Sequence, residues 1–583
     1  MRRYIYIVFT LALLLAVNSC EDFLTTKPLG VTSEEVFYSE KGVNALLTGA
    51  YAHIDGCQAT DGGLCWAGAV SNWVFGSVAS DNSYKGTSFT DQSSINPIER
   101  WEVLTENNYP ENRWRQNYDG IERVNNMLKV MAQVDASALS DAKRSQYKAQ
   151  ALFLRAWFHF ELKRSFDNIP YITEDVEDPG AVSNTIDAWP LIEADLTYAY
   201  QNLPNRQTEV GRANKWAAAA VLARVHLFQN DFTAAETLLD DIINNGGFTL
   251  VTDWHDNGRI SGNNNSESIF EIQYAVNDGS YGSSSAGWGD CLNFPQSGDM
   301  GLCCGFHQPS QNFVNAFKVD ANGLPLLDTF NDTDLKSDQG VLSSETFVPF
   351  TDVVDPRLDM TVGRRGIPVL DWGIMRGKDW IREQPNGGPY IYKKNLFYES
   401  EKNSLSTTTG WAVGVNANNF RAYRLAHVYL WKAECAAQRG DLATALDYVN
   451  RIRNRAKNSP VVMGLCTMYE LPSIAAYEGY VDYDQPAANY MVEPYPSFPD
   501  QAYALKAIRH EMRLEFGMEG HRFFDLIRWG IAEQTLNAFA QADTRIRSFM
   551  QGAVFNSNHD EYMPIPQSQI DISVGALVQN PGY

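Results

Sequence analysis

Two copies of one helix–turn–helix pattern, about 200 residues apart, constrain the fold of this chain more than any other sequence feature. Residues 215–245 carry small and apolar side chains at helical spacing on both sides of a short turn at 229–231, as in a tetratricopeptide repeat. The pattern lies at Ala219, Leu222, Ala223, His226, Phe232, Ala235 and Leu239, and residues 421–456 repeat it with Ala433, Ala436, Ala445 and Val449. Because a helical repeat cannot bury its apolar face alone, we expect the two copies to stack while the intervening chain loops out.

Two further segments, residues 150–166 and 502–531, also have helical periodicity, and the first is predicted to end before Pro170. The predicted fold class is therefore mostly α: a tetratricopeptide-like helical scaffold with long loop-rich insertions and short β-hairpins. The scaffold is expected mainly at 110–245, 420–460 and 500–540, and the loop-rich face at 55–109 and 246–419, with a strand-like run at 268–274. Paired charges are predicted to hold the last helical block to its neighbours, at Glu511, Arg513, Glu515, Arg522 and Asp525.

The N-terminus has the features of a secretory signal peptide. Arg2 and Arg3 precede an apolar run that is shorter than the ~20 residues needed to cross a bilayer, and a small residue then precedes Cys20. The pattern is similar to a bacterial lipobox, which predicts a signal peptide at residues 1–19 and lipidation of Cys20. An ordinary signal peptide with an incidental cysteine is the alternative. No later stretch reaches membrane-spanning length, so the expected membrane attachment is through lipid only.

Charge and cysteine content exclude several classes of function. The formal net charge of −23 opposes binding to a phosphate backbone, so no nucleic-acid partner is expected. Seven cysteines follow Cys20, and none has zinc-finger spacing. Cys57 with Cys65, and Cys303 with Cys304, are candidate disulfides, whereas Cys435 in an alanine-rich helix is predicted to be a buried thiol.

Specific catalytic signatures are also missing from the sequence. There is no G-x-S-x-G and no H-E-x-x-H motif, and a glycosidase carboxylate pair has no sequence signature by which it could be recognised or excluded. We expect no catalytic residues, no cofactor and no catalytic metal. Four oxygen-rich residues could hold a structural calcium ion, although a solvated acidic turn is the alternative: Asp328, Asn331, Asp332 and Asp334.

The loop-rich blocks contain many of the chain's 14 tryptophans, flanked by Gly, Asn and Asp. An aromatic ring can stack on the apolar face of a sugar while neighbouring polar side chains bind its hydroxyls, so these loops predict a ligand site. The predicted ligand-binding residues are Trp66, Asp81, Asn82, Tyr84, Trp101, Tyr281, Trp288, Trp372, Arg376 and Trp380. We expect Trp101 or Trp288 to supply much of the stacking. The alternative for each aromatic ring is a place in the core.

In its order of motifs, the chain resembles the SusD/RagB family of surface glycan-binding lipoproteins. The motifs are the lipobox at Cys20, AQALFLRAWFHFELKRSFDNIPYI from Ala149, GRANKWAAAAVLARVHLFQNDFTAAE from Gly211 and DPR at 355–357. They continue with RLAHVYLWKAECAAQRGDLATALDYVNRIRNRA from Arg424, EMRLEFGMEGHRFFDLIRWG from Glu511, MPIPQSQI from Met563 and QNPGY from Gln579. The resemblance covers nearly the whole chain and implies one SusD-like domain at residues 20–583.

This resemblance implies a binding protein rather than an enzyme. It implies a lipid-anchored protein, displayed on the surface of the outer membrane, that captures an oligosaccharide or polysaccharide for a SusC-like TonB-dependent transporter. It also implies ligand contacts at Asp81 and Asn82, with an aromatic partner at Trp101. A family member that binds peptide or another nutrient, a surface hydrolase and a pure repeat scaffold remain as alternatives.

Overall fold

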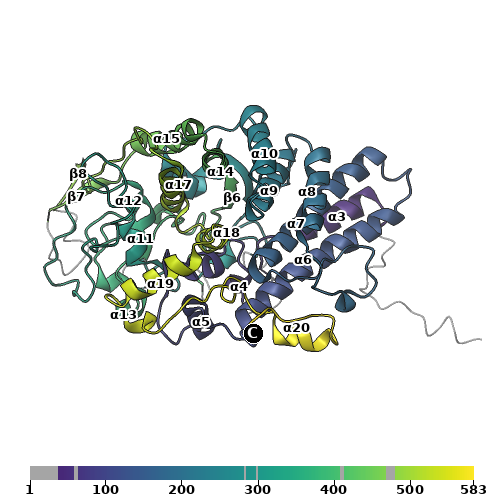
Figure 1. Ribbon diagram of the computed structural model, residues 1–583, viewed down its shortest axis with the longest axis horizontal. Coiled ribbons are helices and arrows are strands. Elements are labelled where there is room, and N and C mark those ends of the chain that lie inside the picture. Colours follow the sequence, from purple (N-terminus) through teal and green to yellow (C-terminus); the bar gives the residue numbers. More distant parts are fainter. Residues whose placement is uncertain (1–36, 58–63, 281–283, 297–299, 408–411, 468–479) are drawn as a thin grey trace, which may run out of the picture.

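The computed structural model describes residues 37–57, 64–280, 284–296, 300–407, 412–467 and 480–583. In Figure 1 long helices form the right-hand part of the molecule and continue across the top to α14, α15 and α17, while short helices and strands joined by loops make up the rest of the left-hand part. The C-terminal segment runs along the lower edge in the same view, below both halves.

The secondary structure is mostly helical. The α-helices are α3 (Glu40–Tyr51), α4 (Cys65–Gly68), α5 (Asn96–Arg100), α6 (Asn108–Gln133), α7 (Asp141–Phe166), α8 (Trp189–Asn202), α9 (Lys215–Phe228), α10 (Phe232–Asn245), α11 (Gln311–Asn315), α12 (Arg357–Thr361), α13 (Gln384–Gly387), α14 (Leu425–Gln438), α15 (Leu442–Asn458), α17 (Gln501–Phe516), α18 (Arg522–Arg528), α19 (Ala532–Asp543) and α20 (Gln567–Ile572). The strands are β1 (Ser83–Gly86), β2 (Ser268–Ile272), β3 (Phe306–Pro309), β4 (Val362–Gly363), β5 (Ile391–Tyr392), β6 (Phe420–Arg424), β7 (Met463–Cys466) and β8 (Val481–Pro486).

The two helix–turn–helix units stack on one another, which confirms the prediction from their spacing. Helices α6, α7, α8, α9 and α10 pack in chain order, α10 then packs against α14, and α14 packs against α15 and α17. Similar caps begin the second helix of each unit: the Asp231 carboxylate accepts a hydrogen bond from Ala234 N, and the Asp441 carboxylate accepts one from Thr444 N. Residues far apart in the sequence thereby form one continuous helical layer.

Two predicted boundaries differ from the structure. Helix α7 begins at Asp141 rather than at residue 150, because Ser140 caps it and its first turns are solvent-exposed, without an apolar face to reveal them. The second repeat was predicted to begin at residue 421, but residues 420–424 form strand β6 and the helix begins at Leu425. Strand β6 pairs with β2, so pairing with a distant segment decides its conformation.

The strands form four separate two-stranded antiparallel sheets in the described residues: β1 with β3, β2 with β6, β4 with β5, and β7 with β8. The run predicted at 268–274 is strand β2, which confirms that prediction. The pair of β2 with β6 joins the long insertion to the start of the second helical unit. The pair of β1 with β3 joins two loop-rich segments that are far apart in the sequence, and the pair of β4 with β5 lies within the long insertion.

Buried ion pairs hold helix α17 in place, as its sequence predicted. Glu515 lies between Arg357, at 3.1 Å, and Arg424, at 2.6 Å, and it also pairs with Arg455. Burial alone would raise the pKa of Glu515, but the three guanidinium groups hold it well below its usual value. Glu511, one helical turn earlier, pairs with Arg357 at 2.7 Å and with Arg453 at 2.8 Å. The DPR motif at 355–357 is therefore part of the structural contact between the two halves.

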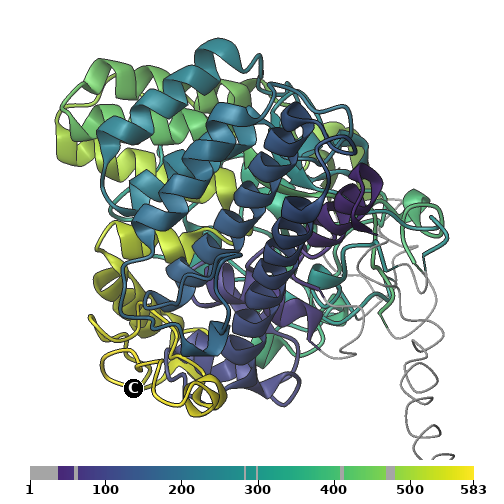
Figure 2. The same cartoon turned by 90° about the vertical axis from the view of Figure 1, so that its right-hand side faces the viewer.

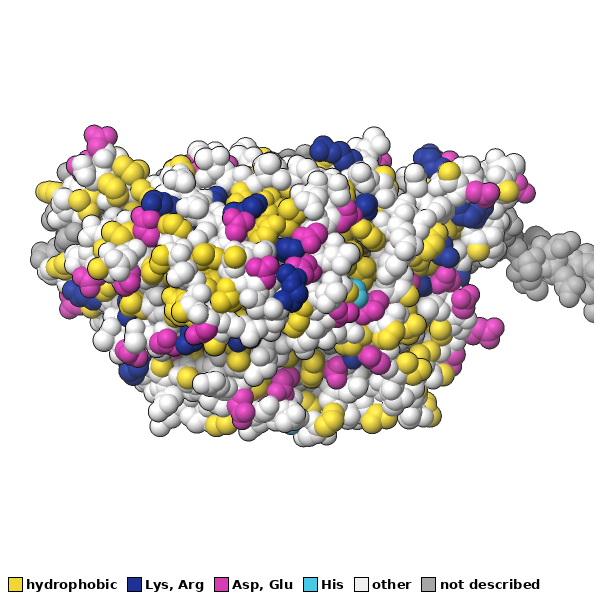
Figure 3. Space-filling model, turned by 45° about the horizontal axis from the view of Figure 1, so that its top comes forward, with side chains coloured by type: hydrophobic (Ala, Val, Ile, Leu, Met, Phe, Trp, Pro, Cys, Tyr) yellow, Lys and Arg dark blue, Asp and Glu magenta, His cyan; other side chains and the backbone are white. Residues whose placement is uncertain are grey.

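The described cysteines form two disulfides, Cys57 with Cys65 and Cys303 with Cys304. Cys435 is a buried free thiol, as expected for its helix, and Cys291 and Cys466 are also free and buried. On the face that Figure 3 shows, acidic, basic and apolar side chains are interspersed. None of the described helices is both long enough and apolar enough to span a bilayer.

Candidate functional site

Asp81 and Asn82 lie inside the molecule, bonded to the C-terminal helices. The Asp81 carboxylate accepts hydrogen bonds from Arg522 at 2.8 and 3.0 Å and pairs with Arg513 at 3.1 Å. Asn82 Oδ1 accepts a hydrogen bond from Arg513 Nε at 2.9 Å. Burial would raise the pKa of Asp81, but these two arginines lower it, so the carboxylate is charged and paired. Both side chains therefore join the segment just before β1 to helices α17 and α18.

Tyr84 and Trp101 are also packed in the core. The Tyr84 hydroxyl donates to Asp543 at 2.5 Å, and Arg547 lies over its ring. Trp101 is only 5% exposed, and its indole N–H donates to the Ala79 carbonyl at 2.9 Å. The edge of its ring contacts Phe555. In this conformation neither ring offers an open face for a sugar.

Two more predicted residues, Trp372 and Trp380, belong to a second apolar core under the loop-rich half, and Arg376 lies between them in the sequence. Trp372 and Trp380 are both buried in it, and the Trp372 indole N–H donates to the Phe397 carbonyl at 2.8 Å. Arg376 is half-buried and pairs with Asp379 at 3.4 Å. These side chains are separate from the Asp81 group, so the structure does not gather all the predicted residues in one patch. Their part in binding stays a prediction.

Trp66 and Trp288, in contrast, come from two elements that pack together, α4 and the 3₁₀ turn η8 (Trp288–Asp290). Trp66 is buried and its indole N–H donates to Gln92 at 3.4 Å, while Trp288 is half-buried. Of the predicted aromatic side chains that the structure describes, Trp288 is the one that is half-buried rather than buried. Tyr281, like Cys20, lies outside the described residues.

Three side chains that the sequence analysis missed accompany Trp288. We call Asp55, Trp66, Tyr274, Trp288 and Asp290 the Trp288 region. Burial raises the pKa of Asp55 to about 7 and that of Asp290 to about 6, while hydrogen bonds from Cys57 N and from the Ser71 hydroxyl oppose the two shifts. Burial also raises the pKa of Tyr274, and both carboxylates add to that shift.

The chemistry of this region suits an uncharged polar ligand. A carboxyl group that is partly protonated near neutral pH can both donate and accept a hydrogen bond, as a sugar hydroxyl does. The Trp288 ring adds an apolar surface beside these groups. Asp290 follows Trp288 by two residues and could have been found by local proximity, whereas Asp55 lies more than 200 residues earlier and gave no sequence signal.

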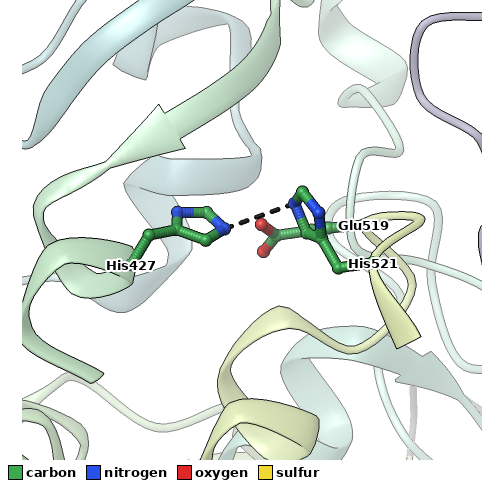
Figure 4. Close-up of side chains that lie close together, drawn as sticks. All are labelled: His427, Glu519 and His521. Carbon is green, nitrogen blue, oxygen red and sulfur yellow. Dashed lines mark hydrogen bonds between the residues drawn. The ribbon is translucent and has the colours of Figure 1, made fainter. Parts of the chain in front are cut away.

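Among the described residues, one group of three side chains has the spacing of a metal site: His427, Glu519 and His521 (Figure 4). Their hydrogen bonds indicate another role. His427 Nδ1 accepts the Arg424 backbone N–H, which places the imidazole proton on Nε2, directed at His521 Nε2 at 3.3 Å. Burial lowers the pKa of both histidines, that of His521 to about 4. The pair is therefore neutral and internally hydrogen-bonded, and the hydrogen bonds engage the lone pairs of His427 Nδ1 and His521 Nε2.

Ion pairs and amide contacts engage side chains of three of the four residues in the predicted calcium loop. Asn315 Nδ2 donates to Asn331 at 2.8 Å and to Asp334 at 2.9 Å, and Arg545 pairs with Asp334 at 3.1 Å. Asp328 pairs with Lys506 at 2.5 Å. A structural calcium ion at this loop stays a prediction.

Comparison with known proteins places these features in context. A family model described as "SusD family" matches residues 266–583, more than half of the chain. A second model, described as "Starch-binding associating with outer membrane", matches residues 22–227. A curated relative, SusD-like protein P25 of Formosa agariphila, is 23% identical over 616 residues, an alignment that covers 100% of this chain and 98% of the relative.

Solved structures share the fold. Surface glycan-binding protein A of Bacteroides thetaiotaomicron, in complex with laminarihexaose, has a TM-score of 0.63 and 21% sequence identity, covering 93% of this chain and 99% of that one. A laminarin-binding SusD-like protein has a TM-score of 0.62 and 22% identity, covering 94% of this chain and 100% of that one. At these identities, the likeness establishes the fold alone.

Proposed function

Because the chain belongs to the SusD family, we propose that it is a cell-surface lipoprotein that binds an oligosaccharide or polysaccharide and passes it to a TonB-dependent transporter of the outer membrane. The observation that carries the proposal is the family match itself, supported by solved neighbours of the same fold whose names state laminarin or laminarihexaose as ligand. The name of the second matching model, which refers to starch binding and the outer membrane, supports the location.

We place the binding surface at the Trp288 region. The half-buried Trp288 ring would stack on a sugar ring, and Asp55 and Asp290 would hydrogen-bond its hydroxyl groups. Lipidation of Cys20 would hold the protein at the membrane, and the partner transporter would receive the glycan. No turnover is part of this function: the protein captures a ligand and releases it unchanged.

A glycan array probed with the purified protein tests the proposal, followed by calorimetry with the best ligand. Trp288→Ala should weaken binding about thirtyfold or more, because removing a central aromatic anchor costs more than ~2 kcal/mol. Tyr483→Ala, a half-exposed aromatic on strand β8, is the matched control and should bind like the wild type. An array that is blank for every glycan would reject the proposed function.

The same ligand also tests the absence of catalysis. Asp55 and Asp290 are carboxyl groups whose raised pKa values resemble those of general acids, so they are the groups to examine. Incubation of the glycan with the purified protein should release no reducing sugar. If sugar release persists through repurification and disappears in Asp55→Asn or Asp290→Asn, the protein is a hydrolase and the proposal of a binding protein is wrong.

A further inference from the structure

A groove of about 650 Å³ runs along helix α6, away from the predicted loop site. Its three walls are α6, the segment at residues 170–180 and the C-terminal residues 569–577. Figure 1 places α20 below α6, and Figure 2 places the C-terminal segment beside the lower ends of the long helices. No residue of the Trp288 region lines this groove.

Helix α6 presents two adjacent stripes to the groove. The first is polar and repeats every three to four residues, which is the spacing of one helix face: Asn112, Arg115, Asp119, Glu122, Asn126 and Lys129. The second lies next to it and is largely apolar: Trp114, Tyr118, Ile121 and Asn125. At a rise of 1.5 Å per residue the polar stripe extends for roughly 25 Å. The groove therefore has one polar side, and at its base Tyr118 is half-buried while Trp114 and Ile121 are buried.

The opposite wall is fixed to α6 by hydrogen bonds. The Tyr118 hydroxyl donates to the Pro170 carbonyl at 2.8 Å, and Asn125 Nδ2 donates to the Ile172 carbonyl at 3.0 Å. The C-terminal wall is held by Ser568, whose hydroxyl donates to Glu111 at 3.0 Å. A ligand would enter a groove that is already formed, and would not have to order either wall first.

The lining selects the chemical class of ligand. Arg115 and Lys129 supply two positive charges, and Asp119, Glu122 and Glu177 supply three negative ones, so the groove does not favour an anion. Glu122, Asn126 and Lys129 are solvent-exposed, which leaves carboxylate, amide and ammonium groups available to hydroxyls. Tyr118 and Val176, which are half-buried, and Ile572, which is exposed, add apolar surface. A neutral ligand whose rings have apolar faces and carry hydroxyl groups at their edges matches this combination.

We propose that this groove is a second oligosaccharide-binding site, for a neutral hexose chain. The inference rests on the proposed function and adds a second site to it. The Trp288 region and the α6 groove would each bind glycan, so the protein would carry two sites per chain. When two weak sites on the protein bind the same polysaccharide, its capture is strengthened, because the second contact becomes intramolecular once the first has formed.

Calorimetry of the purified protein with laminarihexaose, and in parallel with maltohexaose, tests the second site. At least one hexaose should bind with two sites per chain. The double variant Glu122→Ala/Asn126→Ala should remove one of them, or weaken it about tenfold or more, and leave the other unchanged. Both side chains are exposed, so thermal melting should match the wild type. Gln133→Ala, exposed at the end of the same helix and outside the groove, is the control and should keep both sites.

The outcomes separate this proposal from the proposed function. A single site that Trp288→Ala abolishes and the double variant leaves intact would overturn the groove site, while the proposed function would stand. If neither hexaose binds, the groove site is also overturned, and the glycan array, with its charged and branched glycans, decides the proposed function separately. If the double variant instead lowers recovery of a co-purifying protein and leaves hexaose binding unchanged, the groove is a protein-docking surface and the proposal is wrong.

Discussion

Trp101 and Trp288 illustrate how little the local sequence says about the role of a loop tryptophan. Both lie in the predicted loop-rich blocks, between charged residues for Trp101 and between glycines for Trp288, and both were candidates for stacking on ligand. In the structure Trp101 is 5% exposed and donates its indole N–H to a backbone carbonyl, whereas Trp288 is half-buried. Burial depends on the segments that cover each ring, and for Trp101 one of these is Phe555, more than 400 residues away.

Trp101→Ala should therefore destabilise the protein, because it removes a large buried ring and leaves the Ala79 carbonyl without its donor. The expected cost in unfolding free energy is about 3–5 kcal/mol. Chemical denaturation of the wild type and of this variant measures it, and Trp288→Ala, at a half-buried position, should lose much less. Equal stability of Trp101→Ala and the wild type would contradict the core position of this ring.

Asp81 and Asn82 explain why the candidate site was only partly predictable. Their sequence context is polar and irregular, as at many ligand sites, and nothing nearby reveals their true neighbours. Those neighbours are Arg513 and Arg522, more than 400 residues later. Residue type and spacing therefore identify polar loop positions as candidates for ligand binding. Only the folded structure distinguishes the side chains that face ligand from those that form ion pairs inside the protein.

Helices α9 and α18 show the same long-range pairing at the scale of elements. Asp525 on α18 pairs with Arg224 on α9 at 2.6 Å and with Arg528 on its own helix at 2.7 Å. Burial would raise the pKa of Asp525, but Arg224 and Arg528 lower it to about 2. The sequence predicted that Asp525 forms an ion pair, and the structure identifies the helix to which it is joined.

The lowered pKa gives Asp525 a pH-dependent contribution to stability. Because the folded-state pKa is below the unfolded value of about 4, the contribution is fully present above pH 4 and is lost as the pH falls toward 2. Asp525→Asn should lower the unfolding free energy at pH 7 by about 3–5 kcal/mol, since it breaks a buried pair. The difference from the wild type should shrink by about 2 kcal/mol as the pH falls from 4 to 2, because Asp525 is then neutral as well.

Denaturant titrations of both proteins across that pH range test this expectation. Glu533→Gln, an exposed carboxylate on α19, is the control and should follow the wild type at every pH. A stability difference between the wild type and Asp525→Asn that stays constant from pH 7 to pH 2 would show that the Asp525 charge contributes nothing to folding.

The elements themselves were predictable to the extent that their patterns were local. The α9–α10 and α14–α15 units follow from apolar periodicity and Asp caps within 35 residues. The first two turns of α7 were missed because they are exposed, and β6 was missed because its conformation depends on pairing with β2. Periodicity detects an element that buries one face, and it fails where a distant partner decides the conformation.

At the scale of the whole molecule, buried charges join the helical scaffold to the loop-rich half. Glu515 on α17 contacts Arg357, which lies within the long insertion, as well as Arg424 and Arg455 from the scaffold. Removal of one partner from such a buried network costs several kcal/mol, so the loops are held against a fixed support. Loop side chains positioned in this way can form a binding surface without ordering on contact.

The sequence predicts that a lipid on Cys20 attaches the whole molecule to the membrane. Cys20→Ala should lose membrane association, because the anchoring free energy comes from burial of acyl chains, at ~0.8 kcal/mol per methylene. Fractionation of cells that express each form measures it. A partner transporter could retain the unlipidated protein, so the comparison is repeated in cells that lack that transporter. There the variant should be soluble and the wild type membrane-bound; a variant that still sediments with membranes would refute lipidation at Cys20 as the anchor.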